Sequence, residues 1–133
     1  MNIGEAAKAS GVSAKMIRYY EEVGLIPAVA RSDSGYRIYG QSDIQVLQFV
    51  RRSRDLGFSV DEIGTLLGLW RDRGRQSGDV KRIAQAHIVD LQRRIAQLQQ
   101  MAATLQTLAD CCAGDERPDC PILADLAPPV GTP

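Results

Sequence analysis

The sequence of 133 residues lacks the features of several common protein classes. No apolar run approaches the roughly 18 uninterrupted residues that a membrane-spanning helix needs. The first residues also lack a basic head followed by an apolar segment, the pattern of a secretory leader. We therefore expect a cytoplasmic protein without membrane contact. Aromatic residues make up only 5% of the sequence, which predicts an aliphatic core.

Histidine and cysteine are scarce as well. The one histidine, His87, has no neighbouring nucleophile, and no paired carboxylates flank a glycine-rich motif, so we predict that the chain is not an enzyme. The three cysteines are an odd number, which disfavours a disulfide framework in a reducing compartment. Thiol or metal chemistry is the remaining role for them.

The chain also has no net charge, because 16 basic residues balance 16 acidic ones. This balance argues against a general nucleic-acid coat. Residues 13–54 nevertheless carry seven Lys and Arg against four Asp and Glu, a local net charge of plus three. The local excess places a candidate phosphate-contacting surface in the first half of the chain.

The first half of the chain has the pattern of a helix-turn-helix. Apolar residues at helical spacing predict a helix over residues 2–9, which Gly11 ends. Ser13 is a suitable N-cap for a second helix that stops at Gly24. Two short helices joined by a glycine-containing turn are typical of this motif.

Further elements follow the two helices. Residues 31–39 have turn residues in the middle and alternating residue types after them, which predicts a small hairpin or wing. Ser42 and Asp43 are candidate caps of a third helix that runs to about Leu56. A fourth helix is expected from a capping box at Ser59 to about Asp72.

A long helix is expected over residues 78–110, with Ser77 as its N-cap. At about 1.5 Å per residue it would be roughly 50 Å long, too long to be covered by a small head. The chain has no second run of this kind, so pairing with a second copy is favoured over an intrachain hairpin. The apolar seam has alternating steps of four and three: Ala84, Ile88, Leu91, Ile95, Leu98, Ala102, Leu105 and Ala109.

Basic and aromatic residues gather on the second helix and on the wing. Arg and Lys bind phosphates or guanine edges, and Tyr hydroxyls donate to phosphates, so we predict a DNA interface here. For Tyr20, core packing and DNA contact are equally open, and Tyr36 also has packing as an alternative. The candidates are Lys15, Arg18, Tyr19, Tyr20, Arg31, Tyr36, Arg37 and Tyr39.

Three cysteines lie close together beyond the long helix. Gly114 and Pro118 break helices, so the segment should loop back and bring Cys112 and Cys120 toward each other. Two sulfurs suit a soft monovalent ion such as Cu(I), whereas structural Zn(II) normally takes four ligands. Burial of the cysteines as small apolar residues is the alternative, and His87 is expected to pack or to lie at the surface rather than to bind metal.

The chain resembles the MerR family of transcriptional regulators, and within it the copper-responsive CueR/HmrR branch. The resemblance covers nearly the whole chain. It is carried by MNIGEAAKASGVSAKMIRYYEEVGLIP, RSDSGYRIY, RRSRDLGFSVDEIGTLL and the element from Cys112 to Ile122.

The resemblance implies a mainly α fold with a winged helix-turn-helix head, a long dimerisation helix in an antiparallel coiled coil, and a metal-binding loop. It implies a homodimer that binds promoter DNA and distorts it on binding metal, so that RNA polymerase can use a promoter whose spacer is too long. Target genes would encode copper efflux and detoxification. We expect a winged-helix DNA-binding domain over residues 1–75 and a dimerisation helix over 76–110. A metal-binding loop with a short helix should follow over 111–126, and then a frayed tail over 127–133.

Site residues are also implied by the resemblance. Cys112 and Cys120 match the two metal ligands of the branch, and Gly35 is a further DNA-binding residue of the wing. Relatives that sense divalent ions have Cys where this chain has Ser77, which favours Cu(I), Ag(I) or Au(I) here. The additional thiol of Cys111 is a departure from the branch, and we favour a spectator role over substitution for Cys112 or a third ligand.

Three other functions stay open. A divalent-metal sensor of the same family would need a further ligand. A redox sensor would need a cluster that normally takes four cysteines, and this chain has three. A cytosolic metal-buffering protein would leave the basic wing and the heptad seam unexplained.

Overall fold

The computed structural model describes residues 1–129, and six helices make up its regular structure. Contacts divide the chain into one unit of residues 1–83 and another that begins at Ala84. Of the frayed tail predicted for residues 127–133, positions 130–133 lie outside the described residues.

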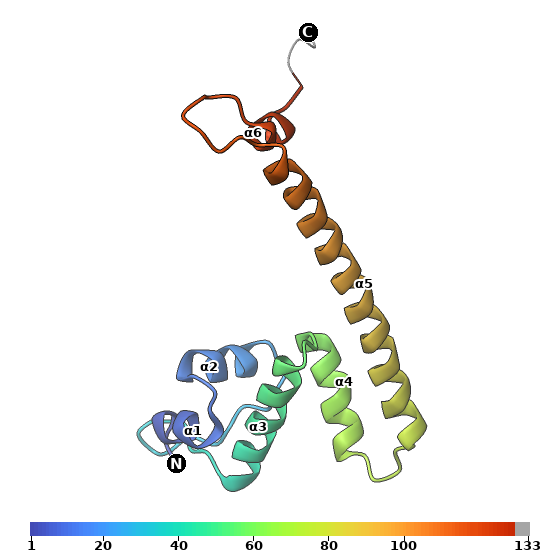
Figure 1. Cartoon of the computed structure of the whole chain (residues 1–133). Helices are drawn as coiled ribbons and strands as arrows, with labels where there is room; N and C mark the ends of the chain where they lie inside the picture. Colours follow the sequence, from blue (N-terminus) through green and yellow to red (C-terminus); the bar gives the residue numbers. More distant parts are fainter. Residues whose placement is uncertain (130–133) are drawn as a thin grey trace. The chain divides into compact units, whose positions relative to one another are not determined.

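The first unit is a small helical head. Its helices are α1 (Ile3–Ser10), α2 (Ala14–Glu22), α3 (Gln41–Asp55) and α4 (Val60–Arg71). Helix α3 packs against both α1 and α4, and α1 also packs against α2 (Figure 1). The predicted helix-turn-helix is therefore present as α1 and α2.

The ends of α1 and α2 follow the sequence signals. The Asn2 side chain accepts a hydrogen bond from the backbone N–H of Glu5 at 2.8 Å and caps α1. Gly11 ends α1 with φ of 77°, a left-handed conformation that glycine adopts without strain. The Ser13 side chain caps α2 by accepting from the Met16 backbone N–H, as predicted.

The start of α3 differs from the prediction. The helix begins at Gln41, before Ser42, and the carboxylate of Asp43 accepts from the backbone N–H of Gly40 at 2.8 Å. Asp43 thus stabilises the helix start from inside the first turn, where an acid also complements the helix dipole. The capping box predicted for α4 is present between Ser59 and Glu62.

The predicted wing is a minimal hairpin. Among the described residues it contains an isolated antiparallel bridge between Arg31 and Arg37 and no longer strand. The backbone N–H of Ser32 donates to the Tyr36 carbonyl at 2.7 Å, and Gly35 forms the tip with φ of 85°. The backbone hydrogen bonds of the wing therefore join its two arms to each other.

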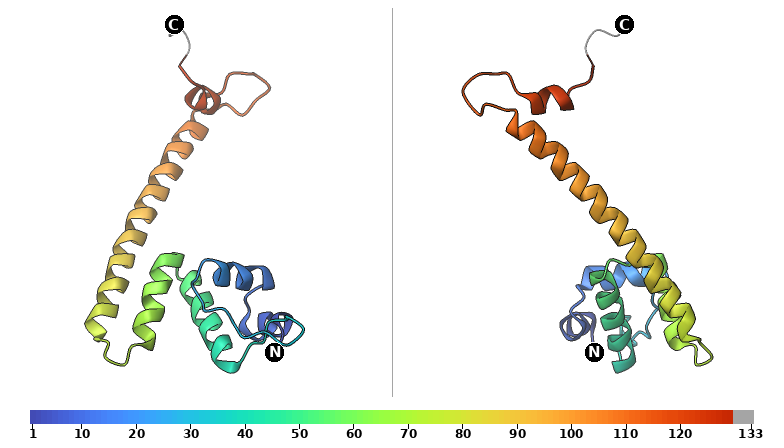
Figure 2. Two further views of the ribbon diagram at one scale, coloured as in Figure 1. Left: turned by 180° about the vertical axis from the view of Figure 1, so that it is seen from behind. Right: turned by 45° about the vertical axis from the view of Figure 1, so that its right-hand side comes forward.

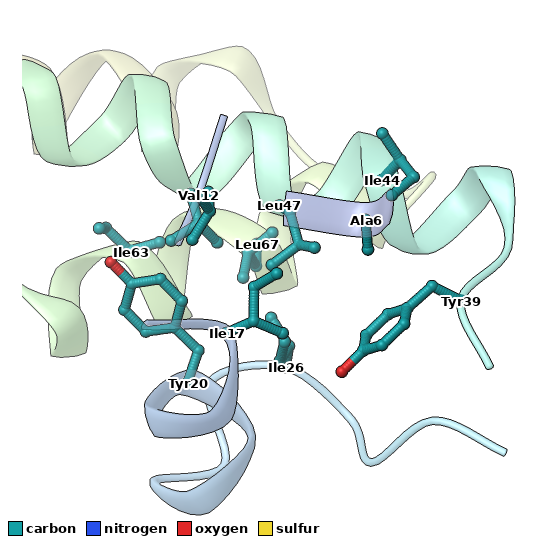
Figure 3. Close-up of a cluster of buried hydrophobic side chains, with 11 residues drawn as sticks. Ala6, Val12, Ile17, Tyr20, Ile26, Tyr39, Ile44, Leu47, Ile63 and Leu67 are labelled. Atoms are coloured by element: carbon teal, nitrogen blue, oxygen red, sulfur yellow. The ribbon is translucent and has the colours of Figure 1, made fainter. Parts of the chain in front are cut away.

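The core of the head is mostly aliphatic, as the composition predicts. Ile17, Leu47, Val50 and Ile63 have no exposed surface and come from three of the four helices. Figure 3 shows side chains from these helices meeting in the core, with the Tyr39 ring directed toward Ile17 and Ile26. Burying side chains of this size stabilises the fold by about 1.5–3 kcal/mol each.

Two of the tyrosines among the DNA candidates belong to this core. Tyr20 is 4% exposed and Tyr39 is 2% exposed. The helical period turns Tyr20 to the same side as Ile17, whereas Arg18 and Tyr19 face outward. Tyr39 lies in the segment that returns from the wing to α3, and its side chain belongs to the buried cluster.

The long helix α5 (Ser77–Asp110) begins in the first unit and continues through the second. It is one uninterrupted helix in both views of Figure 2. Ser77 is its first residue, so the predicted N-cap is displaced by one position, and His87 is buried at 6% exposure. Much of the predicted seam is exposed: Ile88 by 50%, Ile95 by 53%, Leu98 by 62% and Leu105 by 52%.

Candidate nucleic-acid interface and metal centre

The outward face of α2 carries the basic residues predicted for it. Lys15 and Arg18 are exposed, and Tyr19 is 39% exposed beside them. All three lie on the side of α2 opposite to Ile17 and Tyr20, because the buried pair anchors the helix to the head. The helix therefore presents cations and one phenol to a ligand outside the protein.

The wing carries a second set of polar groups. The Arg31 guanidinium donates from Nη1 to the Gly35 carbonyl at 2.9 Å, which closes the hairpin tip. Tyr36 is 73% exposed. A tyrosine this exposed contributes little to the fold and is available for contact with a partner.

A hollow of about 130 Å³ joins the wing to the two helices of the motif. Arg18 of α2 and Arg31 and Arg37 of the wing line it together with the start of α1. Three arginines line this one concave surface, which suits a phosphate, since Arg binds phosphate oxygens with paired N–H groups. The hollow is lined by these residues: Asn2, Ile3, Arg18, Arg31, Gly35, Tyr36 and Arg37.

Glu21 is the residue of this surface that sequence reasoning missed. Its carboxylate accepts from Arg37 Nε at 2.8 Å and from the Tyr39 hydroxyl at 2.6 Å. Burial, followed by the hydrogen bond to Glu21, raises the pKa of Tyr39 above its ordinary value, so this phenol stays protonated and donating. The sequence shows Glu21 only as one of several acids near basic residues and carries no signal for these contacts.

The cysteine loop connects α5 to a short helix, α6 (Pro121–Leu126). The Cys112 thiol donates to the Cys120 sulfur, and the two Sγ atoms are 3.9 Å apart. The predicted approach of these two cysteines is therefore confirmed. Gly114 turns the loop with φ of 66°, and Asp115 holds it by accepting from the Arg117 backbone N–H at 2.9 Å and from Arg117 Nε at 2.8 Å.

The sulfur of Cys120 lies at the start of α6. The backbone N–H of Leu123 lowers the pKa of the Cys120 thiol below its ordinary value, with smaller contributions from the Ile122 N–H and the Cys112 thiol. Burial opposes this effect only in part. The thiolate is the form that binds metal, so the local backbone favours the ligating state.

Cys111 and Ser77 are the two other positions of interest. Cys111 is exposed, whereas Cys112 and Cys120 are half-buried. Ser77 is exposed at the start of α5. Within residues 1–129, no group of three or more His, Cys, Asp or Glu side chains is arranged to hold one metal ion. The same residues contain no helix long and apolar enough to cross a bilayer.

The fold and these surfaces define a helix-turn-helix regulatory protein. The family model for MerR HTH family regulatory proteins matches residues 1–70, and a model described as MerR, DNA binding, matches residues 44–108. The chain belongs to the MerR family of transcription regulators and is not an enzyme.

Individual relatives are similar over nearly the whole chain. The heavy metal-dependent transcription regulator 2 of Rhizobium meliloti (strain 1021) is 60% identical over 127 residues, covering 96% of this chain and 86% of the relative. The HTH-type transcriptional regulator CueR of Escherichia coli O157:H7 is 42% identical over 127 residues, covering 96% and 94%. The regulator PbrR691 from Ralstonia metallidurans CH34, solved in complex with lead(II), is 33% identical with a TM-score of 0.82, covering 96% and 99%.

Proposed function

We propose that this chain is a copper-responsive transcription regulator of the cytoplasm. It binds promoter DNA as a homodimer and activates transcription when Cu(I) binds to Cys112 and Cys120. Ag(I) and Au(I) share the soft monovalent character of Cu(I) and would bind to the same sulfurs. The controlled genes would encode copper efflux and detoxification.

The observation that carries the proposal is the 3.9 Å between the Cys112 and Cys120 sulfurs. Metal–thiolate bonds are about 2.3 Å long in zinc sites, so two sulfurs that share one ion lie no more than about 4.6 Å apart. The two sulfurs of this loop meet that condition. Soft thiolate ligands favour Cu(I), and a bound ion would hold the two ends of the loop together.

The choice of a monovalent ion rests on the number and type of ligands. Two sulfurs satisfy Cu(I), whereas Zn(II) in structural sites takes four ligands. Ser77 stands where divalent-ion sensors of the family have Cys, and a hydroxyl is a poor ligand for soft metals. Relatives named as heavy metal-dependent regulators and as CueR support a metal effector for this chain.

The DNA interface that we propose combines the outward face of α2 with the wing. Arg18, Arg31 and Arg37 around one hollow support phosphate contact at this surface. Tyr20 and Tyr39 enter the proposal as packing residues beneath it, because their side chains are buried. The contact residues are Lys15, Arg18, Tyr19, Arg31, Gly35, Tyr36 and Arg37.

The homodimer is supported by the apolar seam of α5, whose residues Ile95, Leu98 and Leu105 are more than half exposed in the single chain. Apolar residues at this spacing are buried when two helices pair. Two heads held by one dimer would contact two half-sites, as DNA-binding dimers of this motif class do.

Activation by DNA distortion is the mechanism that the resemblance to the family implies, and we include it in the proposal. The dimer would hold a promoter with a long spacer in either of two shapes, and metal would favour the bent and untwisted one that RNA polymerase can use. The metal must therefore bind more tightly to the dimer on distorted DNA than to the dimer on undistorted DNA. The loop at the Cys112–Cys120 pair is the element whose state the ion changes.

A divalent-metal sensor is the second candidate. It is favoured by one observation, the structural likeness to a regulator solved with lead(II). A divalent ion here would need Cys111 or a group of the second subunit as a further ligand.

Anaerobic titration with Cu(I), and separately with Zn(II), tests the proposal. X-ray absorption then counts the sulfur ligands of the bound ion. We expect one Cu(I) with two sulfurs for each loop, and Zn(II) bound weakly. Three or more sulfur or nitrogen ligands, or tight Zn(II) binding, would overturn the copper assignment in favour of the divalent one.

A further inference from the structure

Glu21 is an acid placed at a surface that we assign to DNA. It lies in the last turn of α2, and its side chain is only 9% exposed. Its two oxygens accept from two different wing residues, Oε2 from Arg37 Nε and Oε1 from the Tyr39 hydroxyl. These partners are 16 and 18 positions away in the sequence. One carboxylate thus connects the second helix of the motif to two residues of the wing's return segment.

The hydrogen bonds inside the wing fix its own shape and do not fix its position on α2. The bridge between Arg31 and Arg37 joins its two arms to each other and does not join them to α2. At its base, the Tyr39 backbone N–H donates to the Met1 carbonyl at 2.7 Å. Among the described residues, two hydrogen bonds join α2 to the wing, and both end on Glu21.

The contact with Arg37 leaves most of that guanidinium available. An arginine has five N–H donors, and Glu21 engages the one at Nε. The Arg37 side chain is 25% exposed and lines the hollow shared with Arg18 and Arg31. The terminal N–H groups can therefore bind a phosphate while the carboxylate fixes the plane of the guanidinium. Fixing a binding group beforehand lowers the entropy lost when the complex forms.

We propose that Glu21 is a positioning residue for DNA binding, which holds the wing arginine Arg37 in its phosphate-contacting orientation. This inference rests on the proposed function, because it assumes that α2 and the wing contact DNA. The effect on DNA affinity that it predicts is opposite to the effect of charge repulsion alone. Removing an acid from a DNA-binding surface should strengthen binding through weaker repulsion, whereas removing Glu21 should weaken it.

The experiment compares Glu21→Gln with Glu22→Gln in the full chain. Glu22 is the next residue of α2, carries the same charge and is exposed, so its substitution measures the loss of one negative charge alone. The probe is a fluorescent duplex selected from a random-sequence library by binding to the unsubstituted chain. Anisotropy titrations at several salt concentrations give the affinity and its salt dependence.

We expect Glu21→Gln to bind the duplex about tenfold more weakly, the scale of one lost charge-assisted hydrogen bond. Its salt dependence should decrease by about one phosphate contact. Glu22→Gln should bind as tightly as the unsubstituted chain or more tightly. In an Arg37→Ala background, Glu21→Gln should cause no further loss, because the effect acts through Arg37.

Two results would overturn the inference. One is Glu21→Gln binding as tightly as Glu22→Gln, and the other is an equal loss with Arg37 already removed, which would indicate a general structural role. If Glu21→Gln does not fold, judged by its thermal unfolding, nuclear magnetic resonance of the unsubstituted chain decides. The Arg37 Nε–H should exchange more slowly with solvent than that of exposed Arg73, and equal rates would contradict the proposal.

Failure of the proposed function would look different. In that case the unsubstituted chain would select no duplex from the library. If it selects one, and Arg18→Ala weakens binding while Glu21→Gln does not, only the role of Glu21 is wrong.

Discussion

The thiol of Cys112 points at the sulfur of Cys120 across 3.9 Å, at the two ends of a loop that contains a left-handed glycine and a closing Asp115–Arg117 pair. Two half-buried thiols at this distance can share one ion. The adjacent Cys111 is exposed, so the chain itself provides a matched control for cysteine substitutions.

Replacing Cys112 or Cys120 with Ser should abolish metal-dependent activation. Each change removes one of two ligands, and a hydroxyl does not replace a thiolate for a soft ion. DNA binding without metal should be within about twofold of the unsubstituted chain, since neither residue belongs to the head. In vitro transcription with and without Cu(I), together with DNA titration, measures both effects.

The control for this prediction is Cys111→Ser, which should respond to Cu(I) like the unsubstituted chain. A lost response in this variant would make Cys111 a ligand. Equal loss of metal-free DNA affinity in the Cys112 or Cys120 variants would show that the cysteines are needed for more than metal binding.

The Cys120 thiol should lose its proton at a lower pH in the folded chain than in the unfolded chain. The Leu123 N–H lowers the pKa of this thiol in the folded chain, so the folded state favours the thiolate. That contribution to stability is present above the unfolded thiol's pKa, about 8.5, and is lost as the pH falls through the lower folded value. The rate of alkylation by iodoacetamide is measured against pH by peptide mass spectrometry. The pH midpoint for Cys120 should be lower in the folded chain than in the same chain in denaturant. Equal midpoints would contradict the role of the α6 backbone.

The phosphate role of Arg18 can be tested by its salt dependence. Arg18 is exposed on α2 and shares the basic hollow with Arg31. Arg18→Ala should weaken DNA binding and reduce the slope of log affinity against log salt by about 0.9, the contribution of one phosphate. Arg73→Ala, an exposed arginine beyond α4, is the control and should leave the slope unchanged. An unchanged slope for Arg18→Ala would remove this residue from the contact surface.

Most of the head could be predicted from the sequence because its signals are local. Ser13, Ser59 and Gly11 set helix ends through hydrogen bonds or a backbone conformation within a few residues. The close approach of Cys112 and Cys120 was also predictable, since they are only eight positions apart and the residues between them include two helix breakers.

The features that were missed depend on contacts between distant parts of the chain. Glu21 meets Arg37 and Tyr39 only after the wing folds back on α2, and nothing within a few residues of Glu21 signals this. The alternation of Tyr39 with Arg37 in a short hairpin predicts a DNA contact for Tyr39. Its burial depends on how the return segment lies over the core, which residue type and spacing do not determine.

Pairing through the α5 seam predicts that Leu98→Asn destabilises the homodimer. Leu98 is 62% exposed in the single chain, and burial of a leucine at an interface stabilises it by about 2 kcal/mol. Since both copies lose this contact, the dimer dissociation constant should rise at least tenfold, as sedimentation velocity would measure. Val89→Asn is the control, because Val89 is 65% exposed but lies outside the seam. Equal effects of the two changes would mean that the seam is not the pairing surface.

Metal selectivity should change when Ser77 is replaced by Cys. The resemblance to the family implies a Cys at this position in sensors of divalent ions. A third thiolate adds negative charge and a ligand that Zn(II) or Pb(II) needs. Ser77→Cys should therefore bind Zn(II) at least tenfold more tightly, with Cu(I) affinity changed much less. Competition titrations against a chromophoric chelator measure both affinities. Ser77→Ala separates the new ligand from the lost hydroxyl, and it should bind both ions like the unsubstituted chain. If Ser77→Cys gains no Zn(II) affinity, the start of α5 lies outside the metal site of the assembled dimer, and selectivity must come from the cysteine loop alone.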